Sequence, residues 1–304
     1  MLFSLLHWLF CGSSNVEESK DMSKKKKITC ILLEIVRYAI IIFGAFWMIL
    51  PFFWMFSASL MTPQELLSDV PKWLPEKPQW GNYVEVLRRI PLFNYYKNSF
   101  LVSGSVTLIT IITSSLSGYA FSKLKFAGRK ILFGFVLSTM MFPVFIFLIP
   151  VYYLMRLFGW LDNYLSLIIP FAVSGYGIFL MRQFIMTIPD ELLDSSRLDG
   201  ASEFRIYISI ILPLLKPAIA TLAILTFIGQ WNSFLWPLIV TSTAQKLMTL
   251  PVGISRLSLA FSTTETQHLI LTALVYQVVP MVIIFLYLQR YYVRGFVLSG
   301  FANV

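Results

Sequence analysis

Six long stretches of the chain contain no Asp, Glu, Lys, Arg or His, and charged segments separate them. Each has about the length, roughly 20 residues, that a helix needs to cross a hydrocarbon core. Apolar residues occupy every face of the helix in each stretch, as expected for contact with lipid. None shows the period-two alternation of a membrane barrel strand. The sequence therefore predicts six membrane-spanning helices, at residues 38–60, 98–122, 131–155, 163–181, 217–245 and 269–289.

The composition agrees with an all-α integral membrane protein. Of 304 residues, 57% are hydrophobic and 13% are charged, whereas a soluble domain carries about 25% charged residues. This balance excludes a cytosolic enzyme, a disulfide scaffold and a disordered protein. Cys11 and Cys30 fit neither a disulfide framework nor a metal-ligand spacing, so both are expected to be free thiols.

The distribution of basic residues predicts the orientation in the membrane. With the N-terminus inside, 16 of the 24 Lys and Arg residues fall in inner segments, which favours both termini in the cytoplasm. The net charge of +9 is then a topology signal, and no nucleic-acid partner is expected. The predicted organisation is a cytoplasmic tail at 1–37, a six-helix domain at 38–292 and a cytoplasmic tail at 293–304. Within the first tail, residues 1–21 are treated as an upstream extension before Met22, the alternative start to Met1.

Several motifs are missing from the sequence. It contains no Gly-x-x-x-x-Gly-Lys-Ser/Thr loop, so no P-loop binding of ATP is expected in this chain. The predicted spans hold no ionisable residue, which argues against proton coupling but leaves sodium coupling open. We therefore expect the energy source to lie on another chain. A stand-alone sodium-coupled carrier or membrane enzyme is kept as the alternative.

The inner segment at 186–213 has the signals of two short helices. Thr187, followed three residues later by Asp190, predicts a capping box at the start of the first helix. Gly200 permits the positive φ of a turn that ends this helix. A second helix is predicted from about Ser202, and Pro213 precedes the fifth span.

The spacing within this segment resembles the EAA loop of ABC importer permeases. The loop pattern consists of one acidic and two small residues, then a glycine, then a Leu-Pro pair. The flanking residues look like the carbohydrate-importer version of this loop. The ten residues that carry the resemblance are Glu191, Asp194, Ser195, Ser196, Arg197, Asp199, Gly200, Ala201, Leu212 and Pro213. Asp and two Ser replace the Glu and two Ala that give the loop its name. Residues 229–237, 250–253 and 289–295 are similar to the corresponding parts of maltose-type permease subunits.

This resemblance implies a type I ABC importer permease fold and the smaller, six-span subunit of a heterodimer. It implies, as partners, a second permease subunit, two copies of an ABC ATPase and an extracellular or periplasmic solute-binding protein. The implied location is the bacterial cytoplasmic (inner) membrane, among membrane lipid. The chain is then a transporter subunit and no enzyme. By this resemblance the chain binds no cofactor or metal, and ATP and Mg belong to the partner ATPase. The ten residues named above in the 186–213 loop couple that ATPase to the permease.

Polar and aromatic residues deep in the fifth predicted span indicate a solute path. They are Gln230, Trp231, Asn232, Ser233 and Trp236. Aromatic faces and amides suit a sugar, although such polar residues also join helices to one another in lipid. A sugar, and among sugars an oligosaccharide, is the expected substrate, with a polyol or glycerol-phosphate-type solute as the alternative. The outer segment at 241–267 is expected to dock the solute-binding protein, with a solvated linker as the alternative.

Overall fold

The computed structural model describes residues 24–70, 72–260 and 266–300, with the backbone alone described at 24–31, 258–260 and 288–300. The described part of the chain is helical and contains no strand, which confirms the all-α prediction. Three helices are continuous and are long and apolar enough to cross a membrane. They are α2 (Lys24–Ser59), α5 (Leu92–Lys123) and α16 (Gln267–Gly300).

The other three predicted spans are interrupted, and their expected continuity was wrong. The helix α6 (Arg129–Thr139) meets η2 (Val144–Phe147) and α7 (Leu148–Leu157) at 95°. The pair α8 (Tyr164–Ile168) and η3 (Ile169–Phe171) meets α9 (Gly175–Met186) at 42°. The fifth predicted span, 217–245, is interrupted between α13 (Lys216–Trp231) and α14 (Leu235–Val240). Before this span, the run α11 (Glu203–Ile206), η4 (Tyr207–Ile211) and α12 (Leu212–Leu214) meets α13 at 75°. The described chain thus has up to six spans if each bent pair counts as one.

The breaks have local causes that can be read from the residues beside them. Pro143 has no N–H to continue the helix after α6, and the Thr139 hydroxyl donates to the Val136 carbonyl 2.7 Å away. Ser174 starts α9 as its N-cap, because its hydroxyl accepts a hydrogen bond from the Gly177 N–H at 3.1 Å. Polar side chains and prolines therefore divide stretches that hydropathy alone treats as single helices.

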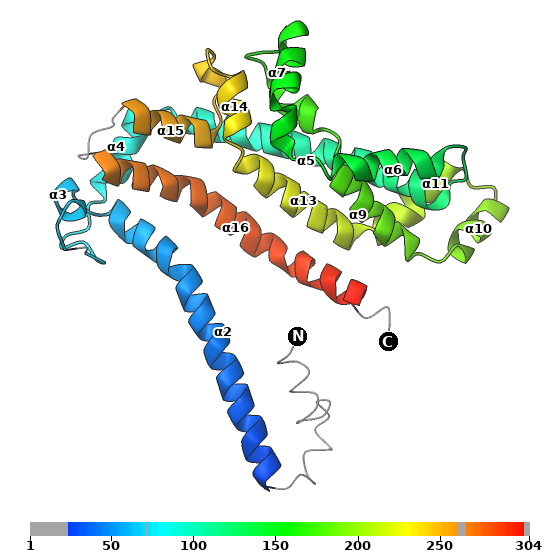
Figure 1. Ribbon diagram of the computed structural model, residues 1–304, viewed down its shortest axis with the longest axis horizontal. Coiled ribbons are helices and arrows are strands. Elements are labelled where there is room, and N and C mark those ends of the chain that lie inside the picture. The colour runs from blue at the N-terminus through cyan, green and yellow to red at the C-terminus, as the bar shows by residue number, and fades with distance from the viewer. Residues whose placement is uncertain (1–23, 71, 261–265, 301–304) are drawn as a thin grey trace.

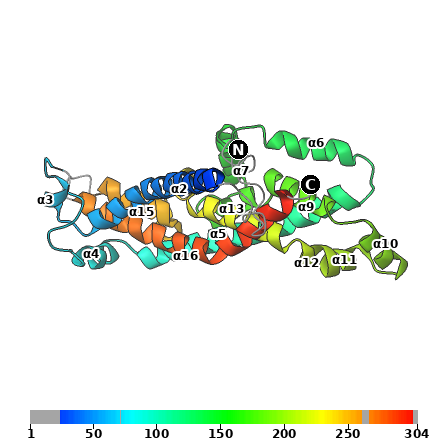
Figure 2. The same ribbon diagram turned by 90° about the horizontal axis from the view of Figure 1, so that it is seen from below.

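Two groups of short elements lie at opposite ends of an elongated molecule, and the short helices α7 and α14 lie between them (Figures 1 and 2). At one end lie α3 (Pro63–Leu66), α4 (Gly81–Arg89) and α15 (Leu250–Ala260), with η5 (Gln245–Leu247) before α15. At the other end lie α10 (Glu191–Leu198) and α11. The predicted topology places the first end outside and the second end inside.

The helix α5 lies at the centre of the packing and contacts α9 and α13. Its approach to α9 depends on a residue without a side chain, because a Cβ at Gly118 would lie 2.7 Å from Met181 Cβ and 2.9 Å from the Arg182 backbone nitrogen. The helix α2 instead contacts α16 near the C-terminal end of α2, and the rest of α2 points away from the bundle (Figure 1).

Some predictions concern parts of the chain that the structure does not describe. The proposed extension at 1–21, the thiols of Cys11 and Cys30, and the side chains of the tail at 293–304 lie outside the described residues. The six-span count, the cytoplasmic location of both termini and the division at residues 37 and 292 stay predictions.

Candidate functional site

The predicted coupling loop forms a compact unit between α9 and α13. Its first helix, α10, ends at a turn in which Gly200 has φ +79°, so the predicted glycine turn is confirmed. The second helix, α11, starts at Ser202, whose hydroxyl accepts from the Arg205 N–H. The predicted capping box was wrong: the Thr187 hydroxyl donates to the Phe184 carbonyl at the end of α9, and Asp190 makes no side-chain cap.

One face of the loop is held by apolar packing. Leu193 on α10 and Ile211 in η4 are fully buried, and Ile206 is almost so. They belong to one cluster with Met181 and Ile185 of α9. This cluster fixes which side of α10 faces the spans and leaves the opposite side exposed.

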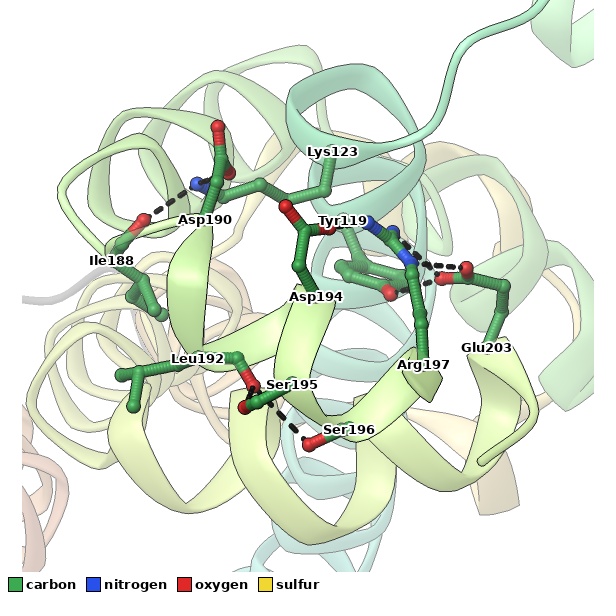
Figure 3. Close-up of polar contacts among 10 residues, drawn as sticks. All are labelled: Tyr119, Lys123, Ile188, Asp190, Leu192, Asp194, Ser195, Ser196, Arg197 and Glu203. Carbon is green, nitrogen blue, oxygen red and sulfur yellow. Dashed lines mark hydrogen bonds and ion pairs between the residues drawn. The ribbon is translucent and has the colours of Figure 1, made fainter. Parts of the chain in front are cut away.

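A network of charged groups joins the two helices of the loop, α10 and α11. Arg197 donates to Asp194 at 2.9 Å and to Glu203 at 2.9 and 3.3 Å, and so bridges α10 and α11 (Figure 3). Tyr119 of α5 donates its hydroxyl to the same Glu203 carboxylate. The hydrogen bonds from Arg197 lower the pKa of Glu203, and those to Glu203 and Asp194 raise the pKa of Arg197. The network therefore stays charged at neutral pH.

Lys123, at the end of α5, holds the start of the loop. Its ammonium donates to the Ile188 carbonyl and lies 2.6 Å from an Asp190 carboxylate oxygen (Figure 3). Only 6% of the Lys123 side chain is exposed, whereas 73% of Asp190 is. The hydrogen bond from Lys123 lowers the pKa of Asp190. A buried cation and an exposed carboxylate thus join α5 to the segment before α10.

Sequence reasoning missed four residues of this site: Tyr119, Lys123, Asp190 and Glu203. Lys123 was read only as a topology signal, and Asp190 only as a cap. Glu203 follows Arg197 by six residues, which is no helical spacing, so only the turn at Gly200 brings the two together. A tyrosine and a lysine four residues apart at the inner end of a span share one helix face, which was the one available signal for α5.

The exposed side of the loop carries apolar side chains beside polar ones. Leu198 is 89% exposed and Phe204 65%, and Leu192 is also exposed. Ser195 and Ser196 donate their hydroxyls to the Leu192 carbonyl within α10, so small side chains cover this part of the helix. Large exposed apolar groups on a charged helix indicate a contact surface for another protein.

The ten predicted coupling residues do not form one cluster. Exposed positions are Glu191, Asp194, Ser195, Asp199, Gly200 and Pro213, and half-buried ones are Ser196, Arg197, Ala201 and Leu212. Ser196, Asp199 and Ala201 border a hollow of about 240 Å³ together with Arg205 and Ser209 of the second helix segment. The two helices of the loop therefore enclose a small open depression on its exposed side.

The five predicted solute-path residues separate into two groups. Ser233 and Trp236 line a cavity of about 590 Å³, which is also bordered by Phe142, Phe171 and Phe234. This cavity lies beside the break between α6 and η2, the break between η3 and α9, and the break between α13 and α14. The Trp236 indole N–H donates to the Ser166 carbonyl at 2.8 Å.

The second group lies away from this cavity. Trp231 is fully buried in an apolar cluster, and its indole N–H donates to the Gln277 carbonyl at 3.2 Å. Asn232 is exposed and donates to Met281 Sδ, and Gln230 is half-buried. The geometry therefore places Trp231 as a packing residue, and only Ser233 and Trp236 on a cavity wall.

Comparisons with known proteins agree with this architecture. Residues 110–297 match the family described as binding-protein-dependent transport system inner membrane component. The chain is 36% identical to the arabinooligosaccharides transport system permease protein AraQ of Bacillus subtilis, over 68% of this chain and 73% of that protein. It is 31% identical to the sn-glycerol-3-phosphate transport system permease protein UgpE of Pectobacterium atrosepticum, over 87% of this chain and 96% of that protein.

A solved structure has the same fold. It is the crystal structure of a bacterial ABC transporter involved in the import of the acidic polysaccharide alginate, and a chain of it superposes with a TM-score of 0.76. The match covers 89% of this chain and 99% of that chain at 24% identity, which is a statement about fold.

Proposed function

The chain belongs to the family of binding-protein-dependent transport system inner membrane components, and from this premise we propose how it works. It is a permease subunit through which an ATP-driven importer moves a sugar, with an oligosaccharide as the first candidate, into the cytoplasm. The observation that carries the proposal is the loop with α10, a short helix that is fixed to the spans by buried Leu193 and that exposes Leu198 and small residues, next to exposed Phe204 of α11.

The partners follow from what the chain contains. Its described residues and its sequence offer no P-loop, so the ATPase is a separate subunit, which holds ATP and Mg and docks on the exposed side of α10. A second permease completes the solute path, an external solute-binding protein delivers the solute, and the complex sits in the bacterial inner membrane. The stoichiometry we propose is two permease subunits and two ATPase copies.

A neutral sugar fits the cavity at the helix breaks better than a phosphate ester. Interrupted spans often border solute sites in transporters, because their backbone groups can face a cavity. Six aromatic rings border this cavity, among them Phe171 and Trp236, and no Lys or Arg lies on its wall. A fixed phosphate would want a cation there. The resemblance to UgpE keeps glycerol phosphate as the second candidate, for which the partner permease would supply that cation.

Gly200→Asp tests the proposed docking of the ATPase on α10. A Cβ at Gly200 meets no atom within 4 Å, and Asp is among the residues that adopt positive φ, so the variant should insert and assemble. The new Asp carboxylate would project from the docking side and should uncouple ATP hydrolysis from solute uptake. The measurement is uptake of a labelled oligosaccharide by proteoliposomes that contain both permeases, the ATPase and the binding protein, with hydrolysis recorded in parallel.

Gly128→Asp is the matched control. Gly128 has φ +80° and an equally open Cβ position, but it lies in the segment between α5 and α6. We expect the control to transport like the wild type. Normal uptake by Gly200→Asp would contradict docking on α10.

A further inference from the structure

The loop with α10 is anchored to a helix that is distant from it in sequence. Its chain neighbours are α9 and α13, but within the described residues the hydrogen bonds that long-helix side chains make to the loop come from α5. Tyr119 and Lys123 donate these bonds, and the Ser115 hydroxyl is paired with another hydroxyl. The three residues precede their loop partners by 65 to 92 residues. These three residues occupy the last three turns of α5, and Figure 3 shows Tyr119 and Lys123 pointing toward the loop.

Each anchor is buried on the α5 side. Tyr119 is 4% exposed, and the Lys123 side chain is nearly as covered. Ser115 is buried and lies 2.7 Å from the Tyr207 hydroxyl of η4. Side chains in such surroundings have few other rotamers, so a displacement of their partners moves the helix that carries them.

The anchors also restrict the direction of movement. The apolar cluster beneath the loop resists separation but lets surfaces slide, because apolar contacts are not directional. Charge-assisted hydrogen bonds have narrow distance and angle ranges. Lys123 holds the segment before α10 by two acceptors, and Tyr119 reaches α10 through Glu203 and Arg197.

The opposite end of α5 holds the outer segment in a similar way. Asn98 is buried and donates to the carbonyls of Lys246 and Met248, each at 2.8 Å. The Ser99 hydroxyl accepts from the Leu250 N–H at 2.8 Å. One straight helix thus binds the coupling loop at one end and the segment before α15 at the other (Figure 1).

We infer that Tyr119 and Lys123 are positioning residues that transmit the movement of α10 into α5, and that α5 passes it through Asn98 and Ser99 to the outer segment at 246–250. This inference rests on the proposed function, since it needs an ATPase that moves α10. It adds a residue-level path by which that movement reaches the outer end of the molecule.

The test is the number of solute molecules imported per ATP hydrolysed by the complete reconstituted complex. Lys123→Met keeps most of the apolar stem and removes the ammonium, and Tyr119→Phe removes one oxygen. We expect the double variant to import about five- to tenfold less solute per ATP, the lower part of the usual range for coupling between sites, while its hydrolysis rate stays within about twofold. Lys130→Met and Tyr153→Phe, both at exposed positions, should match the wild type.

Rescue separates positioning from a merely structural role. Lys123→Arg can donate to both Ile188 and Asp190 and should restore the import ratio. If the double variant does not assemble, Tyr119→Phe alone decides, and we expect a smaller loss in the same direction. A wild-type import ratio in Tyr119→Phe and in Lys123→Met would overturn the inference while leaving the proposed function intact. A wild-type complex that fails to import any solute on ATP hydrolysis would instead contradict the proposed function.

Discussion

Two helices of similar length, α2 and α5, have opposite relations to the rest of the molecule. In its most apolar 18-residue window α2 has 0% of its residues buried, whereas α5 has 44% buried. Phe43, Trp47 and Met48 of α2 all face outward. On α5 the buried side chains include small and hydroxyl-bearing ones: Ser99, Ser103, Thr107, Thr110, Ser114, Ser115 and Gly118.

The difference teaches which features of a span indicate its role. Both helices satisfy the same hydropathy criterion, because lipid is as apolar as a protein core. Association between spans instead depends on close approach, which needs small side chains, and on hydrogen bonds between helices. A helix with these residues along it belongs to the interior of the bundle, while a helix covered in Phe, Ile and Trp has its surface in contact with lipid or another subunit.

The largest expected difference between the two helices comes from substituting one glycine on each. Gly118→Val forces α5 away from α9, because its Cβ would lie 2.7 Å from Met181 Cβ and 2.9 Å from the Arg182 backbone nitrogen. We expect about 3 kcal/mol of destabilisation, the upper part of the range for overpacking. At Gly44 of α2 a Cβ meets nothing within 4 Å, so Gly44→Val should be neutral.

The measurement for this pair is the thermal unfolding midpoint of each variant in mild detergent. We expect Gly118→Val to unfold about 5 °C or more below the wild type and Gly44→Val to unfold with it. Equal midpoints would show that the close approach of α5 and α9 does not hold the bundle together.

A smaller effect is expected at a polar residue of α5. Asn98→Ala leaves the buried Met248 carbonyl, the Lys246 carbonyl and the Tyr164 hydroxyl without the partner that Asn98 provides. An unpaired buried group costs about 1–3 kcal/mol, and we expect about 2 kcal/mol here. Phe46→Ala on α2, where 60% of the side chain is exposed, should leave the midpoint unchanged. The same thermal assay checks both, and a loss confined to Phe46→Ala would reverse the assignment of interior and exterior helices.

The smallest effect is expected from pH at the end of α5 that contacts the loop with α10. The pKa values of Asp190 and Glu203 are lowered by Lys123 and Arg197 respectively. A group whose pKa is lowered by folding stabilises the fold above its unfolded pKa, about 4, and loses this contribution as pH falls through its folded pKa. The ion pairs should therefore persist from pH 8 to pH 5, and their loss belongs below pH 4.

The check is the import ratio of reconstituted wild-type complex compared with that of Lys123→Met at each pH. The factor between them should be constant from pH 8 to pH 5. If the wild type lost its advantage over Lys123→Met near pH 6, a carboxylate of this network would titrate there, against the direction of its pKa shift.

The sequence predicted the helices better than their interruptions. The continuous helices α2, α5 and α16 contain the spans expected at 38–60, 98–122 and 269–289, apart from Leu60. The breaks beside Pro143 and Ser174 were missed because hydropathy sums over a window, whereas a break depends on one missing N–H or one capping hydroxyl. Proline is not a sufficient signal either, since Pro51 and Pro280 lie inside unbroken helices.

The candidate site was predicted where it is local and missed where it depends on tertiary structure. The glycine turn at Gly200 and the start of α11 at Ser202 follow from neighbouring residues and were confirmed. The bonds of Tyr119 and Lys123 to the loop join residues 65 or more positions apart, and no spacing rule reaches that far. The false capping box has the same origin, because Asp190 binds the distant Lys123.

The most direct test of the central claim is what touches α10 in the membrane. A photo-reactive amino acid is placed at Leu198, which is 89% exposed, and in a second variant at Leu74 near the opposite end, which is 65% exposed. The chain, tagged at its N-terminus, is irradiated in native membranes, purified, and its crosslinked partners are identified by mass spectrometry. The account predicts a P-loop ATPase attached at Leu198 and absent at Leu74. Assembled chain with no ATPase attached at Leu198 would contradict it.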